Sequence, residues 1–226
     1  MDKTNDLAER LNILRAGVLG ANDGIVSVAG VVVGMASATN DPMPIFIAGL
    51  SAVLAGAFSM AGGEYVSVST QKDTEKAAII KQKELLKTNF EEELSSVAKY
   101  YEEQGISPEL SMTIAKEVME KHPLETTIHQ KYNLEVGEYT NPWHAAFSSF
   151  ISFTIGSILP MLTITLFPEN LRVLFTIFAV TVALFVTGFV SATLGGAPRK
   201  PAVFRNVVVG LITMFVTYGI GHLFKI

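Results

Sequence analysis

Residues 17–36 read GVLGANDGIVSVAGVVVGMA, an apolar run that carries one aspartate, Asp23. A helix needs about 20 mostly apolar residues to cross the hydrocarbon core of a bilayer, and this run has that length. It therefore predicts a membrane-spanning helix. It also raises the question of why a carboxylate stands inside that helix.

Four more stretches have a similar length and apolar character. The five predicted spans are residues 13–36, 44–68, 143–166, 171–194 and 204–224. The expected fold class is an all-α integral membrane protein with five transmembrane helices in a lipid bilayer. Cysteine is absent, which excludes disulfides and thiolate metal sites, and a net charge of −4 gives no indication of a nucleic-acid partner.

One long polar segment interrupts the spans and divides the chain. We expect a cytosolic N-terminal arm over 1–12, transmembrane helices over 13–68, a cytosolic helical insert over 69–142 and transmembrane helices over 143–226. The polar stretch that follows the second span has a helical pattern. The second span should therefore continue as a helix into the insert.

The insert carries signals for three further helices. Asn89 and Glu92 predict a capping box at the start of the first. Ser107, which precedes a proline, predicts the N-cap of the second, and that helix should stop before Pro123. The third is expected over about residues 124–134.

The basic residues indicate an orientation, because cytosolic loops carry an excess of Lys and Arg. Short loops are the reliable ones, so the long insert is best left out of the comparison. The remaining basic residues are Lys3, Arg10, Arg15, Arg199, Lys200 and Arg205 on one side, and Arg172 and Lys225 on the other. We therefore expect the N-terminus and the insert in the cytosol and the C-terminus outside.

Two acids, Asp23 and Glu64, lie within the five spans. A charge at the bilayer centre is unfavourable by roughly 2.5–3.5 kcal/mol on insertion scales, so such a residue faces a cavity or a partner. No intramembrane Lys or Arg is expected to pair with these acids, which leaves a proton or a cation as the compensating charge. The alternative for Asp23 is a neutral, hydrogen-bonded acid that ties helices together with help from Asn22.

Met60 stands one helical turn before Glu64, so both side chains point to one face of the second span. A thioether beside a carboxylate is a mixed soft and hard ligand set that favours Fe²⁺, Mn²⁺ or Co²⁺ over Na⁺ or Ca²⁺. Asn22, Asp23, Met60 and Glu64 are the candidate transport path, and the last three are candidate metal ligands. The alternatives are that Met60 only fills space and that Glu64 only reaches the interface.

The insert offers carboxylate, imidazole and thioether groups, which together suit Fe²⁺ or Mn²⁺. Its candidate metal ligands are Glu84, Glu93, Glu103, Met119 and Glu120, with His122, Glu125 and His129 close by in the sequence. The alternative is a solvated helical lobe. The chain has no Glu-x-x-His pair, which disfavours a di-iron enzyme, and the spans lack the Ser/His or paired-Asp arrangement of a hydrolase. We expect no enzymatic activity.

Four stretches resemble the vacuolar iron transporter family, and especially its bacterial members. They are GANDGIVSVAGVVVG, SMAGGEYVSVSTQKD, YYEEQGISPEL and RNVVVGLITMFVTYGIGHLF. The resemblance implies a homodimer with the path between its two copies, and export of Fe²⁺, often also Mn²⁺, from the cytosol in exchange for protons. It implies a bacterial plasma membrane and no permanent cofactor, and it matches Asp23 and Met60 to the family's intramembrane acid and methionine.

The sequence departs from the family pattern at several positions. Glu64 takes a place that plant members fill with glycine, and Ala16 and Ala52 stand where plant members carry further acids. In the insert, Ser96 and Asn133 replace acids of the family pattern. We therefore expect weaker metal binding by this insert than by that of plant members.

Taken together, these features predict proton-coupled export of a divalent transition metal. Cytosolic carboxylates collect the ion, and Asp23, Met60 and Glu64 bind it in the membrane. Two alternatives stay open: a metal channel without proton coupling, and a membrane-anchored cytosolic metal sensor or metallochaperone. Asp23 distinguishes the sensor or metallochaperone from a transporter, because a membrane anchor needs no acid inside the membrane.

Overall fold

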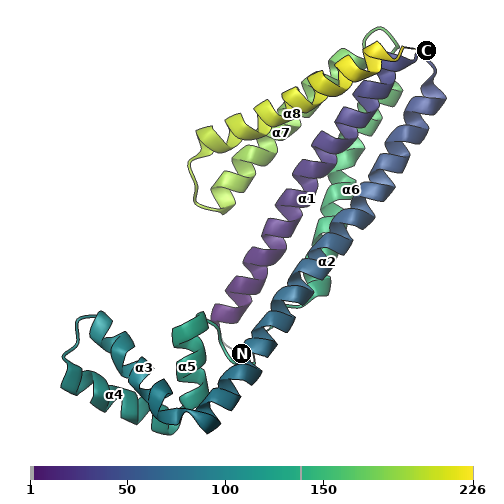
Figure 1. Ribbon diagram of the computed structural model, residues 1–226. Coiled ribbons are helices and arrows are strands. Elements are labelled where there is room, and N and C mark those ends of the chain that lie inside the picture. Colours follow the sequence, from purple (N-terminus) through teal and green to yellow (C-terminus); the bar gives the residue numbers. More distant parts are fainter. Residues whose placement is uncertain (1–2, 138, 226) are drawn as a thin grey trace. The chain divides into compact units, whose positions relative to one another are not determined.

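The computed structural model describes residues 3–137 and 139–225, and every regular element in these ranges is an α-helix (Figure 1). The helices are α1 (Lys3–Ala38), α2 (Pro42–Thr88), α3 (Phe90–Glu103), α4 (Pro108–Lys121), α5 (Pro123–Tyr132), α6 (Pro142–Leu166), α7 (Arg172–Leu194) and α8 (Arg199–Leu223). Five of them, α1, α2, α6, α7 and α8, are long and apolar enough to cross a membrane. The prediction of an all-α chain with five candidate membrane spans is confirmed for the described residues.

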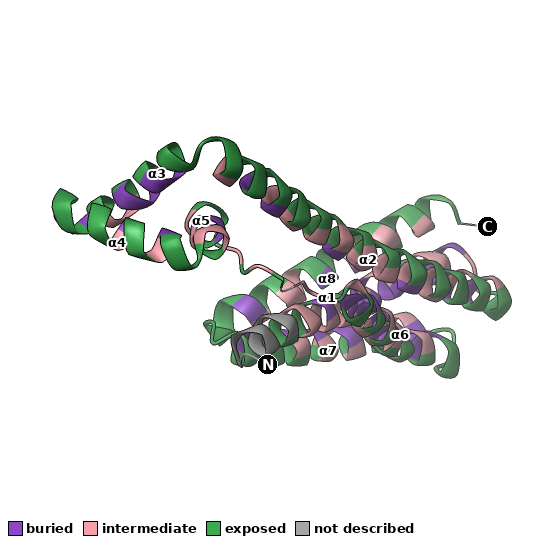
Figure 2. Ribbon diagram, turned by 90° about the horizontal axis from the view of Figure 1, so that it is seen from below, coloured by how far each residue is buried: buried purple, intermediate pink, exposed green. Residues whose placement is uncertain are grey.

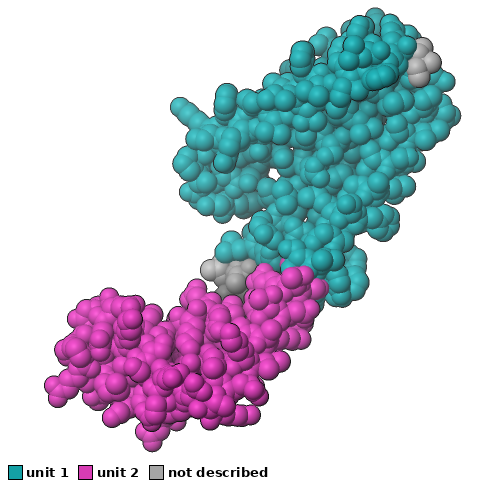
Figure 3. Space-filling model, in the orientation of Figure 1, with its two compact units in different colours: residues 1–67, 141–226 teal, residues 68–140 magenta. Residues whose placement is uncertain are grey.

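The chain divides into two compact units (Figure 3). Residues 1–67 and 141–226 form the first, which we call the membrane unit, and residues 68–140 form the second, which we call the helical lobe. The helix α2 contributes to both, because it runs for 47 residues without a break. The expected continuation of the second span as a helix is therefore confirmed.

The central helix of the membrane unit is α1, which packs against α6, α7 and α8. Two apolar clusters surround it. One joins α1 to α7 and α8 through Val33, Leu184 and Met214, and the other joins α1 to α2 and α6 through Ala57 and Phe153, among others. Buried residues concentrate along these contacts, whereas the outer faces of α2, α7 and α8 expose apolar side chains, as a lipid environment requires (Figure 2).

Small residues bring α1 and α6 close together. A methyl group at Gly24 would collide with the carbonyl oxygen of Phe153, and a methyl group at Gly156 would collide with that of Ala21. Membrane helices depend on such close packing because lipid is as apolar as their own side chains, so burial alone gives little driving force. This contact fixes the part of α1 that carries Asp23.

Arg172, at the start of α7, is only 5% exposed. Its Nη2 donates a 3.2 Å hydrogen bond to the carbonyl oxygen of Thr39, just beyond the end of α1. A cation is favourable at this position because the carboxyl end of a helix carries a partial negative charge. Arg172, which in the sequence served only as a basic residue in the count of charges, thus holds the end of the central helix.

The lobe has an apolar core of its own, in which Leu94, Val97 and Ala98 of α3 pack against Ala115 and Met119 of α4. These residues are nearly or fully buried. The core belongs entirely to the lobe.

The helix ends of the lobe follow the prediction with one error. Ser107 occupies the N-cap of α4 as expected. The capping box at Asn89 is wrong, because the side chain makes no cap bond to the backbone and instead donates a 2.9 Å hydrogen bond from Nδ2 to Glu92 Oε2. The helix α5 ends at Tyr132 because Asn133 adopts a left-handed conformation, with φ of 52°.

Candidate functional site

Asp23 lies on α1 within the apolar stretch and is partly buried. Ser27, one turn further along the same helix, donates a 2.6 Å hydrogen bond from Oγ to Asp23 Oδ1. A short bond of this kind to a carboxylate is among the stronger ones in proteins and fixes the orientation of the acid. Ser27 was not singled out in the sequence, although its spacing of four residues from Asp23 indicates such a bond.

Asn22 makes no hydrogen bond to Asp23 and instead lines a cavity. Its Oδ1 is buried and has no hydrogen-bond partner among the described residues. It lines a cavity of about 390 Å³ between α1, α7 and α8, together with Arg15, Ser191 and Asn206. The structure thus shows Asn22 at a cavity wall, and the bond to Asp23 comes from Ser27 instead.

Glu64 has a basic partner that the sequence did not indicate. Arg15 Nη2 lies 3.3 Å from Glu64 Oε2, so an ion pair joins α1 to α2. The two side chains differ in their surroundings, since that of Glu64 is 10% exposed and that of Arg15 is 63% exposed. The expectation that the intramembrane acids lack a basic partner is therefore wrong for Glu64. The sequence feature that could have indicated this ion pair is that Arg15 and Glu64 lie at the same end of two successive spans.

Met60 is partly buried against the apolar cluster that contains Val28, Ala57 and Phe153. This packing is what a space-filling methionine would show, and it also fixes the position of the thioether one turn from Glu64. Met60 therefore remains a candidate ligand with a structural role as well.

No group of three His, Asp or Glu side chains that could hold a metal ion occurs among the described residues. The carboxylates of Asp23 and Glu64 thus lie outside any such group.

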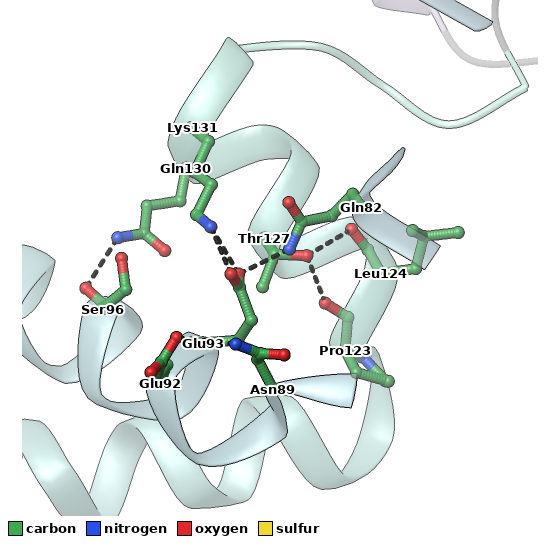
Figure 4. A network of polar contacts seen from close by, with 10 residues as sticks. All are labelled: Gln82, Asn89, Glu92, Glu93, Ser96, Pro123, Leu124, Thr127, Gln130 and Lys131. Carbon is green, nitrogen blue, oxygen red and sulfur yellow. Dashed lines mark hydrogen bonds and ion pairs between the residues drawn. The ribbon is translucent and has the colours of Figure 1, made fainter. Parts of the chain in front are cut away.

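Glu93, one of the candidate ligands in the lobe, is only 6% exposed and already has partners (Figure 4). Lys131 Nζ lies 2.6 Å from Oε1 and 2.5 Å from Oε2, and Gln82 Nε2 donates a 2.5 Å hydrogen bond to Oε2. The lysine compensates the carboxylate charge, and the bonds tie α3 to α5 and to α2. Metal binding at Glu93 would have to displace Lys131.

The remaining candidates of the lobe are not brought together into a site. Met119 is 2% exposed and belongs to the apolar core between α3 and α4. Exposed candidates are Glu84, Glu103, Glu120, His122, Glu125 and His129. Lysines accompany other acids of this surface: a 2.9 Å hydrogen bond from Lys121 lowers the pKa of Glu117, one turn earlier on α4. The lobe thus presents a charged surface.

Comparison with known proteins gives consistent matches over nearly the whole chain. The sequence profile described as the VIT family matches residues 14–222. The vacuolar iron transporter of Acanthamoeba castellanii is 36% identical over 211 residues, which is 93% of this chain and 78% of that protein. Vacuolar iron transporter homolog 2 of Arabidopsis thaliana is 31% identical over 221 residues, which is 97% of this chain and 88% of that protein.

Proposed function

This chain belongs to the VIT family, whose curated relatives include vacuolar iron transporters, and we propose that it exports a divalent transition metal from the cytosol in exchange for protons. Fe²⁺ and Mn²⁺ are the proposed substrates. The observation that carries the proposal is the carboxylate of Asp23, oriented by Ser27 in the apolar stretch of the central helix. An acid in this position marks a path for protons or cations.

The proposed working form is a homodimer. One copy offers isolated carboxylates, and a second copy related by a two-fold axis would add another Asp23 and another Met60 to the same site. Support comes from the exposed apolar face of α2, which includes Ile47, Leu54 and Phe58 and suits either lipid or a second copy. Two carboxylates and two thioethers form a ligand set for a borderline ion such as Fe²⁺.

Proton coupling follows from the chemistry of a shared carboxylate. Metal ions bind the deprotonated form, so a proton and a metal compete for the same oxygens. In the proposed cycle, a metal ion from the cytosol binds Asp23, and protons that enter from outside displace it. The direction rests on the proposed orientation, with the N-terminus cytosolic, in a bacterial plasma membrane.

The helical insert, residues 69–142, has the proposed task of collecting cations at the cytosolic surface. Its exposed acids Glu84, Glu103 and Glu120 suit this task, because weak carboxylate sites raise the local cation concentration. Glu93 and Met119 serve the fold of the lobe in this scheme.

The test is metal flux into proteoliposomes that contain a metal-quenched dye. Fe²⁺ or Mn²⁺ is added outside, with and without an imposed pH gradient, to the wild type and to Asp23→Asn. We expect uptake that follows the gradient in the wild type and is lost in the variant. Asp41→Asn is the matched control: the same change is made at an exposed position outside the apolar stretches, and asparagine preserves the cap of α2 there.

The same assay separates the alternatives. A channel without proton coupling gives uptake in the wild type that ignores the pH gradient. A metal sensor or metallochaperone gives no flux with any metal in folded, dimeric protein, and Asp23→Asn then leaves metal binding by the chain unchanged. Either result would contradict the proposal.

A further inference from the structure

We propose that Arg15 is the resident counter-ion of Glu64, and that an incoming metal ion displaces it. Arg15 would thereby set the metal affinity and the charge selectivity of the entrance. The inference rests on the proposed function, since it concerns the approach to Asp23. Arg15 stands eight residues before Asp23 on α1, a rise of about 12 Å toward the proposed cytosolic end.

The asymmetry of the ion pair indicates which partner moves. The Glu64 side chain is 10% exposed, whereas the Arg15 side chain is 63% exposed and lies 3.3 Å away. A nearly buried carboxylate strongly needs a compensating charge, so it holds whichever cation is available. The Arg15 side chain is largely unburied and has a long flexible stem, so it is the partner that can move away from Glu64.

The structure also contains an acceptor for a displaced Arg15. Arg15 and Asn22 line the same cavity of about 390 Å³, and Asn22 Oδ1 is a buried acceptor without a partner among the described residues. A buried acceptor without a hydrogen bond is unfavourable, and a guanidinium has five N–H donors. Arg15 therefore has two places: on Glu64 when metal is absent, and at Asn22 when a metal ion occupies Glu64.

This arrangement discriminates between cations by their charge. A monovalent ion replaces one positive charge at Glu64 with another and loses the hydrogen bonds that the guanidinium makes. A divalent ion brings a second charge, which favours it over Arg15 at the carboxylate. Na⁺ and K⁺ should therefore fail to open the entrance, whereas Fe²⁺ and Mn²⁺ succeed.

The test measures Mn²⁺ binding by electron paramagnetic resonance and Mn²⁺ flux in proteoliposomes, on full-length protein. The variants are Arg15→Gln, Arg15→Lys, Glu64→Gln and the double variant Arg15→Gln/Glu64→Gln. Arg205→Gln is the matched control, because it removes an exposed arginine next to Asn206 of the same cavity wall. A competition series with Na⁺ accompanies each titration.

We expect Arg15→Gln to lower the half-saturating Mn²⁺ concentration about five- to tenfold, the effect of one partly screened charge, without raising the maximal rate. Mn²⁺ binding by Arg15→Gln should also become sensitive to competition by Na⁺. Arg15→Lys should resemble the wild type, and Arg15→Gln should have no effect when Glu64 is already glutamine.

Two results would overturn the inference alone. One is an unchanged or higher half-saturating concentration in Arg15→Gln while the wild type transports Mn²⁺, and this result leaves the proposed function intact. The other is an equal drop in the Glu64→Gln background, which would assign the effect to general surface charge. Absence of Mn²⁺ binding and flux in folded wild-type protein would overturn both the inference and the proposed function.

Discussion

Ser27 donates a 2.6 Å hydrogen bond from its Oγ to Asp23 Oδ1, one turn away on the central helix. The bond orients the carboxylate of Asp23 without supplying a charge. It therefore affects the deprotonated and metal-bound forms only through the position of the carboxylate oxygens. The carboxylate itself carries the proposed exchange of metal for proton.

Ser27→Ala should therefore weaken transport without abolishing it. Loss of one hydrogen bond to a charged group corresponds to about 1.5–3 kcal/mol at most, and water in the path compensates part of this. We expect a rise of about three- to tenfold in the half-saturating Mn²⁺ concentration. Ser27→Thr keeps the hydroxyl and should have the half-saturating Mn²⁺ concentration of the wild type. Ser51→Ala, at an exposed position on α2, is the control. An inactive Ser27→Thr variant would contradict this role.

Lys131→Met should destabilise the lobe, because it leaves the buried carboxylate of Glu93 without its cation (Figure 4). Removal of one partner of a buried pair costs roughly 3–5 kcal/mol, and since the Lys131 side chain is 27% exposed, we expect about 2 kcal/mol. Hydrogen exchange of α3 and α5 in the full-length protein measures it. Glu93→Gln in the Lys131→Met background should recover part of the loss.

Metal addition completes that experiment. The wild-type lobe should show the same exchange with and without Mn²⁺, because Lys131 already occupies both oxygens of Glu93. If Mn²⁺ slows exchange around Glu93 in the wild type, the carboxylate is a metal ligand and Mn²⁺ displaces Lys131 from it.

Gly156→Ala should destabilise the membrane unit. The added methyl group would meet the carbonyl oxygen of Ala21 at the close contact of α6 with α1, and overpacking of this kind costs about 1–3 kcal/mol. A lower melting temperature in detergent is the expected result. Gly62→Ala is the control, because a methyl group there has open space and alanine favours a helix. Equal melting temperatures for the two variants would contradict the packing argument.

The spans and most helix ends were predictable because local signals determine them. A run of about 20 apolar residues sets the length of a span, and Ser107 before Pro108 marks the start of α4, although the serine side chain makes no cap bond. Asn89 shows the limit of such signals, since its amide bonds a side chain instead of the backbone. A single sequence therefore indicates where a helix begins better than which atoms cap it.

The sequence could indicate that Arg15 and Glu64 lie at the same end of two spans, but it could not determine which charged residues pair, because the partners come from distant parts of the chain. Arg15 and Glu64 are 49 residues apart, and Glu93 and Lys131 are 38 apart. Which faces of the helices meet depends on packing, such as the glycines between α1 and α6. The acids were found by residue type alone, whereas their compensating cations required the structure.

Met60→Leu tests whether the thioether is a ligand. Leucine has a similar volume, so the fold should lose less than about 1.5 kcal/mol. If the sulfur binds the ion, transport of Co²⁺ should fall more than that of Mn²⁺, because the softer ion depends more on the thioether. The measurement is the ratio of the two half-saturating concentrations. Met161→Leu, which packs against the same apolar cluster, is the control, and an equal ratio in both variants would leave Met60 with packing alone.

The orientation can be tested directly because the chain contains no cysteine. Single substitutions Ser107→Cys in the lobe and Glu169→Cys between α6 and α7 place one thiol at each expected side, both at exposed positions. With a maleimide that does not cross membranes, Glu169→Cys should be labelled in intact cells and Ser107→Cys only after permeabilisation. Labelling of both variants in permeabilised cells controls for reactivity. The opposite pattern would place the lobe outside, and since the lobe is proposed to collect the ion, it would turn the proposed exporter into an importer.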